Sequence, residues 1–348
     1  MSKTAAYAAK SNDGKMAPYS IERRDVQSND VQIEITHCGV CHSDLHAIKN
    51  DWGNSKYPLV PGHEIIGTVK KVGSSVTKYK EGDTVGVGCL VDACLSCEAC
   101  DEDLEQHCLG QPTMTYNSQT DDPGGLTYGG YSQRIVVREE FVLKIPENLD
   151  KAGTAPLLCA GITTYSPLHQ YGVKKGMTVG VIGLGGLGHM GIKLSAAMGA
   201  HTVMITTSKS KADDAKELGA DEVLVSSDKD AMKKWAGKFD FLLNTIPVGH
   251  DVNPYLNLLK YNKTMCLVGA IEPLENVNGA MLVTGRKAVA GSLIGGLKET
   301  QEMLDFCGEH NVVATIEEIK MSEINDAFKR MQDNDVRYRF VIDMATLD

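Results

Sequence analysis

The chain has 348 residues and a net charge of −10 at pH 7, and 42% of its residues are hydrophobic. This length predicts about two domains with a large core. The sequence has no Lys- and Arg-rich run, which argues against nucleic-acid binding. It also has no signal-like N-terminus and no apolar run of about 18 residues, so we expect a cytoplasmic protein that does not enter a membrane.

The first part of the chain has the pattern of short strands separated by turns. Residues 31–35 alternate apolar and polar side chains, which is typical of a half-buried strand. Residues 67–76, 83–89 and 131–137 also resemble strands, whereas residues 117–130 are polar and rich in turn residues. We therefore expect a β-rich domain with irregular loops.

The pattern changes near residue 154, where helices and strands begin to alternate. Residues 155–170, which include Cys159, have helical spacing, and residues 178–182 form an apolar strand. Later strands are expected at 202–206, 222–225, 239–243, 264–268 and 339–343, and helices at 189–199, at 211–218 and after residue 298. This alternation predicts an α/β protein with a doubly wound parallel sheet.

Four cysteines are concentrated in one short segment, in the spacing C-x2-C-x2-C-x7-C. The cluster consists of Cys94, Cys97, Cys100 and Cys108. Four thiolates in one loop predict a closed, tetrahedral structural zinc site. An iron–sulfur cluster is the alternative, and disulfides are disfavoured in a long chain of cytosolic type. We read Cys38, Cys89, Cys266 and Cys307 as small buried apolar residues.

A second set of metal-binding residue types is spread along the chain. Cys41, His63 and Cys159 could supply three mixed ligands and leave a fourth position free for water or substrate. That arrangement is typical of catalytic zinc, so we expect two zinc ions per chain.

A glycine-rich motif follows the strand 178–182 directly. Its residues are Gly183, Leu184, Gly185, Gly186, Leu187 and Gly188. A GxGxxG motif alone is weak evidence, but here it lies between a predicted strand and a predicted helix, as dinucleotide binding requires. The helix N-terminus would face the pyrophosphate. The alternative is a purely structural turn.

The end of the second predicted strand indicates which dinucleotide is bound. An NAD enzyme places an acidic residue about 20 residues after the first glycine. Residues 201–212 contain no Asp or Glu, and they offer Thr206, Thr207, Ser208 and Lys211 instead. Hydroxyl and ammonium groups suit a 2′-phosphate, which a carboxylate would repel. The sequence therefore predicts NADP(H), although a solvated polar turn would have a similar composition.

These motifs together resemble those of a known family. The Gly-His-Glu triplet at 62–64, followed by Gly67, Gly73 and Val76, resembles the signature of zinc-containing alcohol dehydrogenases of the medium-chain dehydrogenase/reductase superfamily. Segments 38–46, 158–165 and 338–343 resemble the cinnamyl alcohol dehydrogenase branch, and within it the bacterial broad-specificity NADPH-dependent aldehyde reductases. The resemblance covers essentially the whole chain.

The resemblance implies a GroES-like β-rich catalytic domain, formed by residues 1–154 and 295–348, and a Rossmann NADP-binding domain, formed by residues 155–294. It implies catalytic zinc at Cys41, His63 and Cys159. Glu64 either ligates this zinc when substrate is absent or orients a ligand, and the two roles are equally open. Asp44 is the expected acceptor that orients His63.

The resemblance also implies a proton relay through Ser43 and His46. The alternative is that Ser43 caps a helix starting at Asp44 and that His46 is an ordinary surface residue. Arg339 is expected either to reach the cofactor pyrophosphate or to form a surface ion pair. The expected pocket walls, by analogy only, are Trp52, Leu90, Met114 and Ile294.

We therefore predict a zinc-dependent alcohol dehydrogenase that works mainly as an NADPH-linked reductase of aromatic or medium aliphatic aldehydes. It would act on a small molecule as a homodimer, as is common in this branch. One alternative is an NAD-linked polyol or amino-alcohol dehydrogenase of the same superfamily. Another, of a different class, is a non-catalytic zinc-binding redox sensor.

Overall fold

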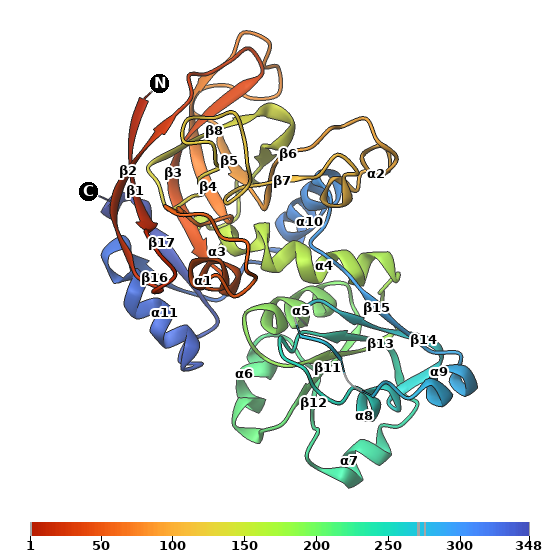
Figure 1. Cartoon of the computed structure of the whole chain (residues 1–348). Helices are drawn as coiled ribbons and strands as arrows, with labels where there is room; N and C mark the ends of the chain where they lie inside the picture. The colour runs from red at the N-terminus through yellow and green to blue at the C-terminus, as the bar shows by residue number, and fades with distance from the viewer. Residues whose placement is uncertain (1, 270–271, 275, 348) are drawn as a thin grey trace. The chain divides into compact units, whose positions relative to one another are not determined.

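The computed structural model describes residues 2–269, 272–274 and 276–347. The chain divides into two compact units, which are considered separately below. Unit 1 consists of Met1–Cys159 and Gly296–Asp348, and unit 2 consists of Ala160–Gly295. Both ends of the chain thus belong to unit 1, where the first and last parts of the sequence lie together (Figure 1).

Unit 1 is built on a seven-stranded, mostly antiparallel sheet in the order β16-β17-β3-β4-β5-β9, with β8 also paired to β3. Its strands are β3 (Asp30–Val40), β4 (Ile65–Val72), β5 (Thr84–Val87), β8 (Arg134–Arg138), β9 (Leu143–Lys144), β16 (Ile316–Lys320) and β17 (Arg339–Asp343). Two further pairs are β1 (Ser2–Ala9) with β2 (Met16–Arg23), and β6 (Leu90–Asp92) with β7 (Thr113–Met114).

The helices of unit 1 are short, except α10. They are α1 (His42–Lys49), α2 (Glu98–Asp101), α3 (Lys151–Thr154), α10 (Leu297–His310) and α11 (Ile324–Gln332). Single 3₁₀ turns are η1 (Glu105–His107), η2 (Glu139–Phe141), η3 (Ala155–Leu158), η5 (Met321–Glu323) and η6 (Met344–Thr346).

Strand β3 organises this sheet, because it pairs with β4 and β8 and also with the C-terminal strand β17. Its alternating Val31, Ile33 and Ile35 are all buried, as the sequence pattern predicts for a strand with one face in the core. The predicted strand at 339–343 is also confirmed, as β17.

Unit 2 is built on a six-stranded sheet in the order β12-β11-β10-β13-β14-β15, and all five pairings are parallel. The strands are β10 (Thr178–Ile182), β11 (His201–Thr206), β12 (Glu222–Val225), β13 (Phe239–Asn244), β14 (Leu259–Leu267) and β15 (Ala288–Gly291). The helices are α4 (Ala160–Gln170), α5 (Gly186–Ala197), α6 (Ala212–Glu217), α7 (Lys229–Lys234), α8 (Asn253–Leu256) and α9 (Gly279–Gly285), with the turn η4 (Lys209–Lys211).

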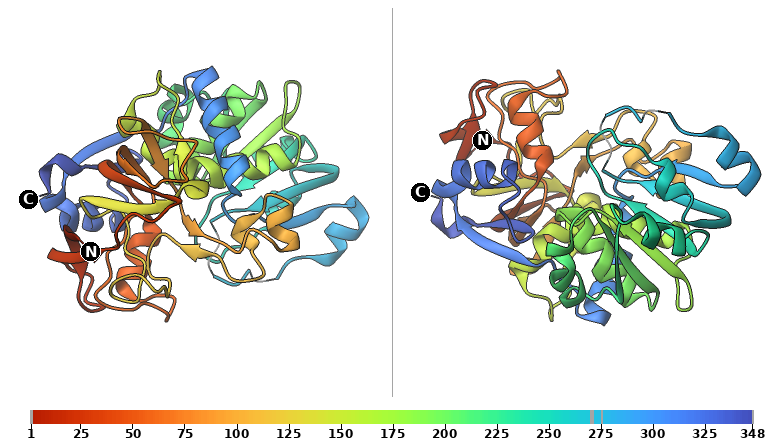
Figure 2. Two further views of the ribbon diagram at one scale, coloured as in Figure 1. Left: turned by 90° about the horizontal axis from the view of Figure 1, so that it is seen from above. Right: turned by 90° about the horizontal axis from the view of Figure 1, so that it is seen from below.

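This topology confirms the predicted α/β class with a doubly wound parallel sheet. Helices lie on both sides of the strands (Figure 2). The strand order reverses between β10 and β13, which are neighbours in the sheet. In sheets of this kind the ligand crevice lies outside the carboxyl ends of the strands at such a reversal. The glycine-rich motif follows β10 at this point.

Two predicted elements differ clearly from the structure. The strand predicted at 67–76 ends at Val72, and residues 73–76 contain a turn. Residues 155–170 are not one helix, because η3 ends at Leu158 and α4 begins at Ala160. Cys159 lies between them with φ −132° and ψ −68°, outside helical geometry. Helical spacing cannot reveal a break of one residue.

Candidate metal centres and dinucleotide site

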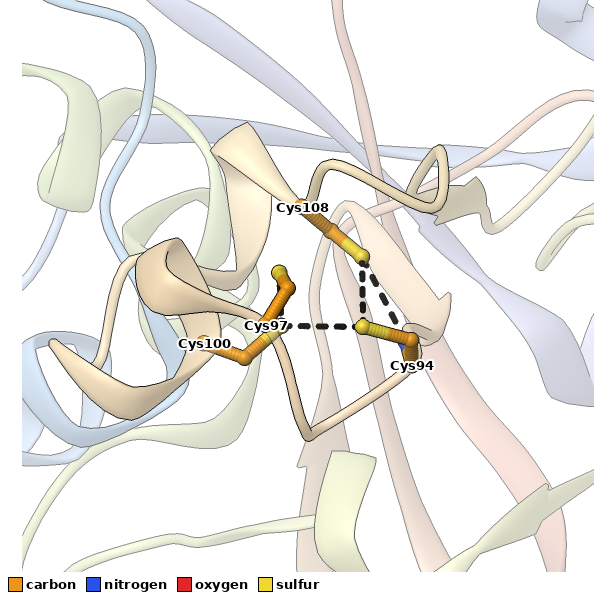
Figure 3. A group of neighbouring side chains, drawn as sticks. All are labelled: Cys94, Cys97, Cys100 and Cys108. Carbon is orange, nitrogen blue, oxygen red and sulfur yellow. Dashed lines mark hydrogen bonds between the residues drawn. The ribbon is translucent and has the colours of Figure 1, made fainter.

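The four clustered cysteines of unit 1 converge on one point, and Figure 3 shows their side chains directed toward one another. The Sγ atoms of Cys94 and Cys108 lie 3.4 Å apart, those of Cys97 and Cys100 lie 3.6 Å apart, and those of Cys94 and Cys100 lie 3.9 Å apart. Four sulfurs bound to one zinc ion at about 2.3 Å would lie about 3.8 Å apart. The spacing fits one ion rather than a multi-iron cluster.

The local backbone favours thiolates in this cluster. The N–H of Leu109 donates to Cys97 Sγ (3.3 Å), and the N–H of Cys94 donates to Cys108 Sγ (3.4 Å). A hydrogen bond from the backbone of Ser96, together with the neighbouring thiols, lowers the pKa of Cys94 to about 6. Because thiolates are the metal-binding form of cysteine, this is a candidate structural zinc site.

A second group of ligand types is buried elsewhere in unit 1. Cys41, His63, Glu64 and Cys159 each place one ligand atom so that all four atoms lie within 4.8 Å of one another. Cys41 precedes α1, His63 and Glu64 precede β4, and Cys159 occupies the break before α4. Two thiols, an imidazole and a carboxylate are a donor set that suits zinc. Glu64 Oε2 is buried without a hydrogen-bond partner in the described part of the chain, as expected of an atom that faces a metal ion.

Asp44 holds the surroundings of this group together. Its fully buried carboxylate accepts hydrogen bonds from the N–H of Cys41 (2.9 Å) and the N–H of Gly62 (3.0 Å). It also faces His63 Nδ1 at 3.2 Å. A carboxylate only accepts, so Nδ1 carries the proton and Nε2 is left for the metal. The predicted partnership between Asp44 and His63 is thus present in the geometry.

Two tyrosines complete the shell around Asp44. The Tyr131 hydroxyl donates to Asp44 Oδ2 at 3.2 Å, and the Tyr116 ring lies 5.6 Å from the His63 ring. Burial raises the pKa of both tyrosines well above their usual value. Tyr131 therefore remains a protonated donor at all physiological pH values. The sequence offered no signal for either residue.

Arg339 is not at the surface, so the predicted surface ion pair is wrong. Its guanidinium is buried, and Nη2 donates to Glu64 Oε1 in a buried ion pair. Burial raises the pKa of Glu64 to about 7, against the opposing effect of the Arg339 charge. The two residues are 275 positions apart and meet because β17 pairs with β3. No sequence motif could have indicated this contact.

Helix α1 carries the two predicted relay residues. Ser43 does not cap it, because α1 begins at His42 and Cys41 is the cap, whose Sγ accepts from the Ser43 N–H at 3.5 Å. His46 Nδ1 lies 2.8 Å from Asp51 Oδ2, and the side chains are 30% and 46% exposed. Asp51, which sequence reasoning missed, therefore provides a partner for His46 near solvent.

The glycine-rich motif of unit 2 has the geometry that a dinucleotide needs. Gly183 has φ 94°, a conformation that other residues rarely adopt. A Cβ on Gly188 would lie 2.1 Å from the carbonyl oxygen of Gly183, so only glycine fits there. A Cβ on Gly185 would meet no protein atom within 4 Å. The backbone of Gly185 is therefore open to a ligand at the N-terminus of α5.

The segment after β11 lies against this motif. Lys211 Nζ donates to the carbonyl oxygen of Leu184 at 3.1 Å, which ties the segment to the glycine-rich loop. Thr206 is buried, and its Oγ1 accepts from the N–H of Ser208 at 3.3 Å. Thr207 and Ser208 are exposed. The predicted phosphate-binding groups thus lie in a hydroxyl-rich turn with a cation at its base.

Comparison with known proteins places these features in a family. Residues 27–147 match the family model "Alcohol dehydrogenase GroES-like domain", and residues 186–309 match "Zinc-binding dehydrogenase". Aldehyde reductase YahK of Escherichia coli (strain K12) is 54% identical over 344 residues, which are 98% of this chain and 97% of that protein.

Two solved structures are similar over their whole length. A cinnamyl alcohol dehydrogenase of Sorghum bicolor (SbCAD4) has a TM-score of 0.95 and 45% identity, covering 100% of this chain and 99% of that one. A CAD from Helicobacter pylori, complexed with NADP(H), has a TM-score of 0.92 and 40% identity, covering 99% of each chain. The chain therefore belongs to the zinc-containing alcohol dehydrogenases of the medium-chain dehydrogenase/reductase superfamily, and is an alcohol dehydrogenase/aldehyde reductase of the cinnamyl alcohol dehydrogenase branch.

Proposed function

We propose that this enzyme transfers hydride between NADP(H) and aromatic or medium aliphatic aldehydes and their primary alcohols. The observation that carries the proposal is the buried group of Cys41, His63, Glu64 and Cys159, whose ligand atoms converge within 4.8 Å. In this proposal, unit 1 supplies the catalytic residues and unit 2 binds the dinucleotide.

Cys41, His63 and Cys159 would hold the catalytic zinc, and Glu64 either ligates it without substrate or orients its surroundings. Bound there, zinc would supply a Lewis acid for the carbonyl oxygen, while the dinucleotide supplies the hydride. The chain's own contribution is positioning. Asp44 fixes the ring of His63 and the backbone on either side of the site, as its hydrogen bonds to Cys41 and Gly62 require.

The proton would travel through Ser43 and His46, with Asp51 holding the imidazole. The 2.8 Å contact between His46 and Asp51 supports this path, because the carboxylate orients the imidazole ring. The contact of the Trp52 ring with the His46 ring, 5.7 Å between centroids, limits the ring's movement. Trp52, Leu90 and Met114 remain predicted pocket residues of unit 1, and Leu90 and Met114 are paired across β6 and β7. The fourth predicted pocket residue, Ile294, belongs to unit 2.

His46→Ala should lower kcat for aldehyde reduction by about 100-fold, because general acid–base catalysis contributes about that much or more. Asp51→Asn should give a smaller loss, of about tenfold, since the ring remains but loses its charge partner. Steady-state kinetics across pH 5 to 9 are the measurement, with exposed His310→Ala as the control. Unchanged kcat and an unchanged pH profile in His46→Ala would exclude the relay.

The NADP(H) preference is proposed to depend on the turn after β11, which lacks a carboxylate between 201 and 212. Lys211→Met should lower kcat/KM for NADPH by about 10- to 100-fold and leave NADH little changed, because a charge-assisted contact to the 2′-phosphate is lost. Lys216→Met, an exposed lysine in α6, is the matched control. Equal losses with both dinucleotides would mean that Lys211 acts only through its bond to Leu184.

We also propose a homodimer and a cytoplasmic location. Strand β15 is one of the two edges of its sheet, the other being β12, and a strand edge carries unpaired backbone groups that favour pairing with another copy. Two exposed apolar side chains flank β15 in the sequence, Val283 of α9 at 81% exposed and Leu293 at 55% exposed. No helix in the described part of the chain is long and apolar enough to span a membrane.

Val283→Glu combined with Leu293→Glu should therefore convert the dimer to a monomer. The two substitutions would bury four like-charged carboxylates in the apolar interface of each dimer. Sedimentation velocity at micromolar concentration measures the change. Leu109→Glu introduces a charge at an equally exposed apolar position of unit 1 and should leave the dimer intact. A wild-type protein that sediments as a monomer would exclude the homodimer.

The function is tested by initial rates with NADPH and NADH against benzaldehyde, cinnamaldehyde and butanal, and by NAD⁺ or NADP⁺ reduction with polyols. We expect turnover of the aldehydes with NADPH. Polyol oxidation with NAD⁺ would support the polyol dehydrogenase alternative, and no turnover with any pair would leave the redox sensor.

A further inference from the structure

The loop 245–250, which follows β13, packs against the glycine-rich loop. Thr245 N and Thr245 Oγ1 both donate to the carbonyl oxygen of Ile182, at 3.0 and 2.8 Å. A Cβ on Gly183 would lie 3.0 Å from Thr245 Oγ1 and 3.6 Å from Ile246 Cγ1. Since β10 and β13 flank the reversal of strand order, where ligands of such sheets bind, this loop and the glycine-rich loop lie together at the expected binding point.

The tip of this loop is apolar and exposed, as suits a surface that a ligand covers. Pro247, Val248 and Gly249 are all exposed, and Val248 is 50% exposed. The N–H of Gly249 donates to Glu272 Oε2 at 2.7 Å, which anchors the tip from one side. A second link joins the residue that precedes the loop to the last residue of the loop.

These two residues are Asn244 and His250. Asn244 Nδ2 and His250 Nε2 form a hydrogen bond of 2.9 Å. His250 Nδ1 lies 2.8 Å from the carbonyl oxygen of Val248, which can only accept, so Nδ1 carries the proton. In the neutral ring Nε2 is then an acceptor. Asn244 Oδ1 accepts from the N–H of Ile246 at 3.1 Å, which fixes the amide with its NH₂ toward the ring.

These contacts therefore fix both the orientation of the Asn244 amide and the position of the proton on the neutral His250 ring. Asn244 is fully buried at the end of β13, so the sheet holds one end of the link rigidly. His250 is half-buried and carries the other end. The link joins the end of β13 to the last residue of the loop, and it adds to the bonds that Thr245 and Gly249 make to neighbouring segments.

We propose that Asn244 and His250 are positioning residues that hold the loop 245–250 in the conformation that binds the dinucleotide. The inference rests on the proposed function, because it assumes that unit 2 binds NADP(H). Neither residue needs to touch the cofactor. Breaking their bond should weaken dinucleotide affinity by letting the loop move, while leaving the glycine-rich loop and β11 intact.

Two substitutions of His250 test the hydrogen bonds of its two ring nitrogens one at a time. His250→Gln places an acceptor oxygen where Nε2 lies, so it keeps the bond to Asn244. His250→Asn places a donor where Nδ1 lies, so it keeps the bond to Val248 but leaves the buried Asn244 amide unpaired. We expect the Kd for NADPH to stay within about twofold of wild type for His250→Gln and to rise about five- to tenfold for His250→Asn.

The Kd values come from the fluorescence of bound NADPH, with the complete protein and no substrate. His201→Asn, at an exposed histidine of the same unit, is the control and should leave Kd unchanged. Equal Kd values for the Gln and Asn variants would overturn the inference. A wild-type protein that binds no dinucleotide would instead overturn the proposed function.

A measurement on the wild-type protein covers the case in which His250→Asn folds poorly. Hydrogen exchange of the backbone N–H groups of residues 245–246 and 248–250 should slow by about tenfold or more when NADPH is added at saturating concentration. Unchanged exchange in these residues, with slowed exchange in residues 183–188, would show that the loop is no part of the binding site.

Discussion

Replacing Cys159 by alanine should lower kcat/KM for aldehyde reduction by about 1,000-fold and reduce the zinc content from about two ions per chain to about one. Lewis-acid stabilisation of the developing alkoxide is worth several kcal/mol, and each 1.36 kcal/mol corresponds to a factor of ten in rate. Cys41 and His63 alone would hold zinc poorly, whereas the separate cluster at Cys94–Cys108 should keep its ion.

The matched control is Cys307→Ala, because Cys307 is also fully buried in unit 1 but belongs to neither ligand group. It should retain two zinc ions and nearly wild-type activity. Metal analysis by mass spectrometry and initial rates on the same samples are the measurements. A Cys159→Ala protein that keeps two zinc ions and full activity would remove Cys159 from the catalytic centre.

Replacing Arg339 by leucine should destabilise the fold by about 3–5 kcal/mol, because it leaves the buried Glu64 carboxylate without its partner. The double variant Arg339→Leu with Glu64→Leu should recover much of this loss, since no uncompensated charge then remains buried. Urea unfolding followed by circular dichroism gives the changes in the free energy of unfolding.

The same chain supplies an exposed ion pair for comparison. Arg330 and Glu317 contact each other at 2.8 Å with side chains 38% and 33% exposed, so Arg330→Leu should cost only about 0–1 kcal/mol. If Arg339→Leu costs no more than Arg330→Leu, the pair between Arg339 and Glu64 does not hold the two parts of unit 1 together.

Much of the fold could be read from local patterns. The strand 178–182, the glycine-rich turn and the helix that follows are local in sequence, and each contributes a separate signal. The spacing of the four cysteines was equally informative, because four thiols in one short segment predict a shared metal site, although the spacing alone left zinc and an iron–sulfur cluster both open. The family resemblance then supplied the grouping of Cys41, His63 and Cys159, which no spacing indicates.

What the sequence did not indicate depends on contacts between distant segments or on single dihedral angles. Arg339 was expected to reach the cofactor pyrophosphate or to form a surface ion pair, and neither expectation included its buried contact with Glu64, which forms because β17 pairs with β3. The break at Cys159 involves one residue within a pattern that is otherwise helical. The bond between Asn244 and His250 closes a loop without periodicity, so neither residue had a reason to be singled out.

The central claim is that a zinc ion held by Cys41, His63 and Cys159 supports NADPH-dependent reduction of an aldehyde. It is tested most directly by the rate of NADPH oxidation with cinnamaldehyde before zinc removal, after dialysis against a chelator, and after zinc is restored. We expect loss of nearly all activity when zinc is removed and recovery when about two zinc ions per chain are bound again. Full activity in protein shown by metal analysis to be zinc-free would contradict it.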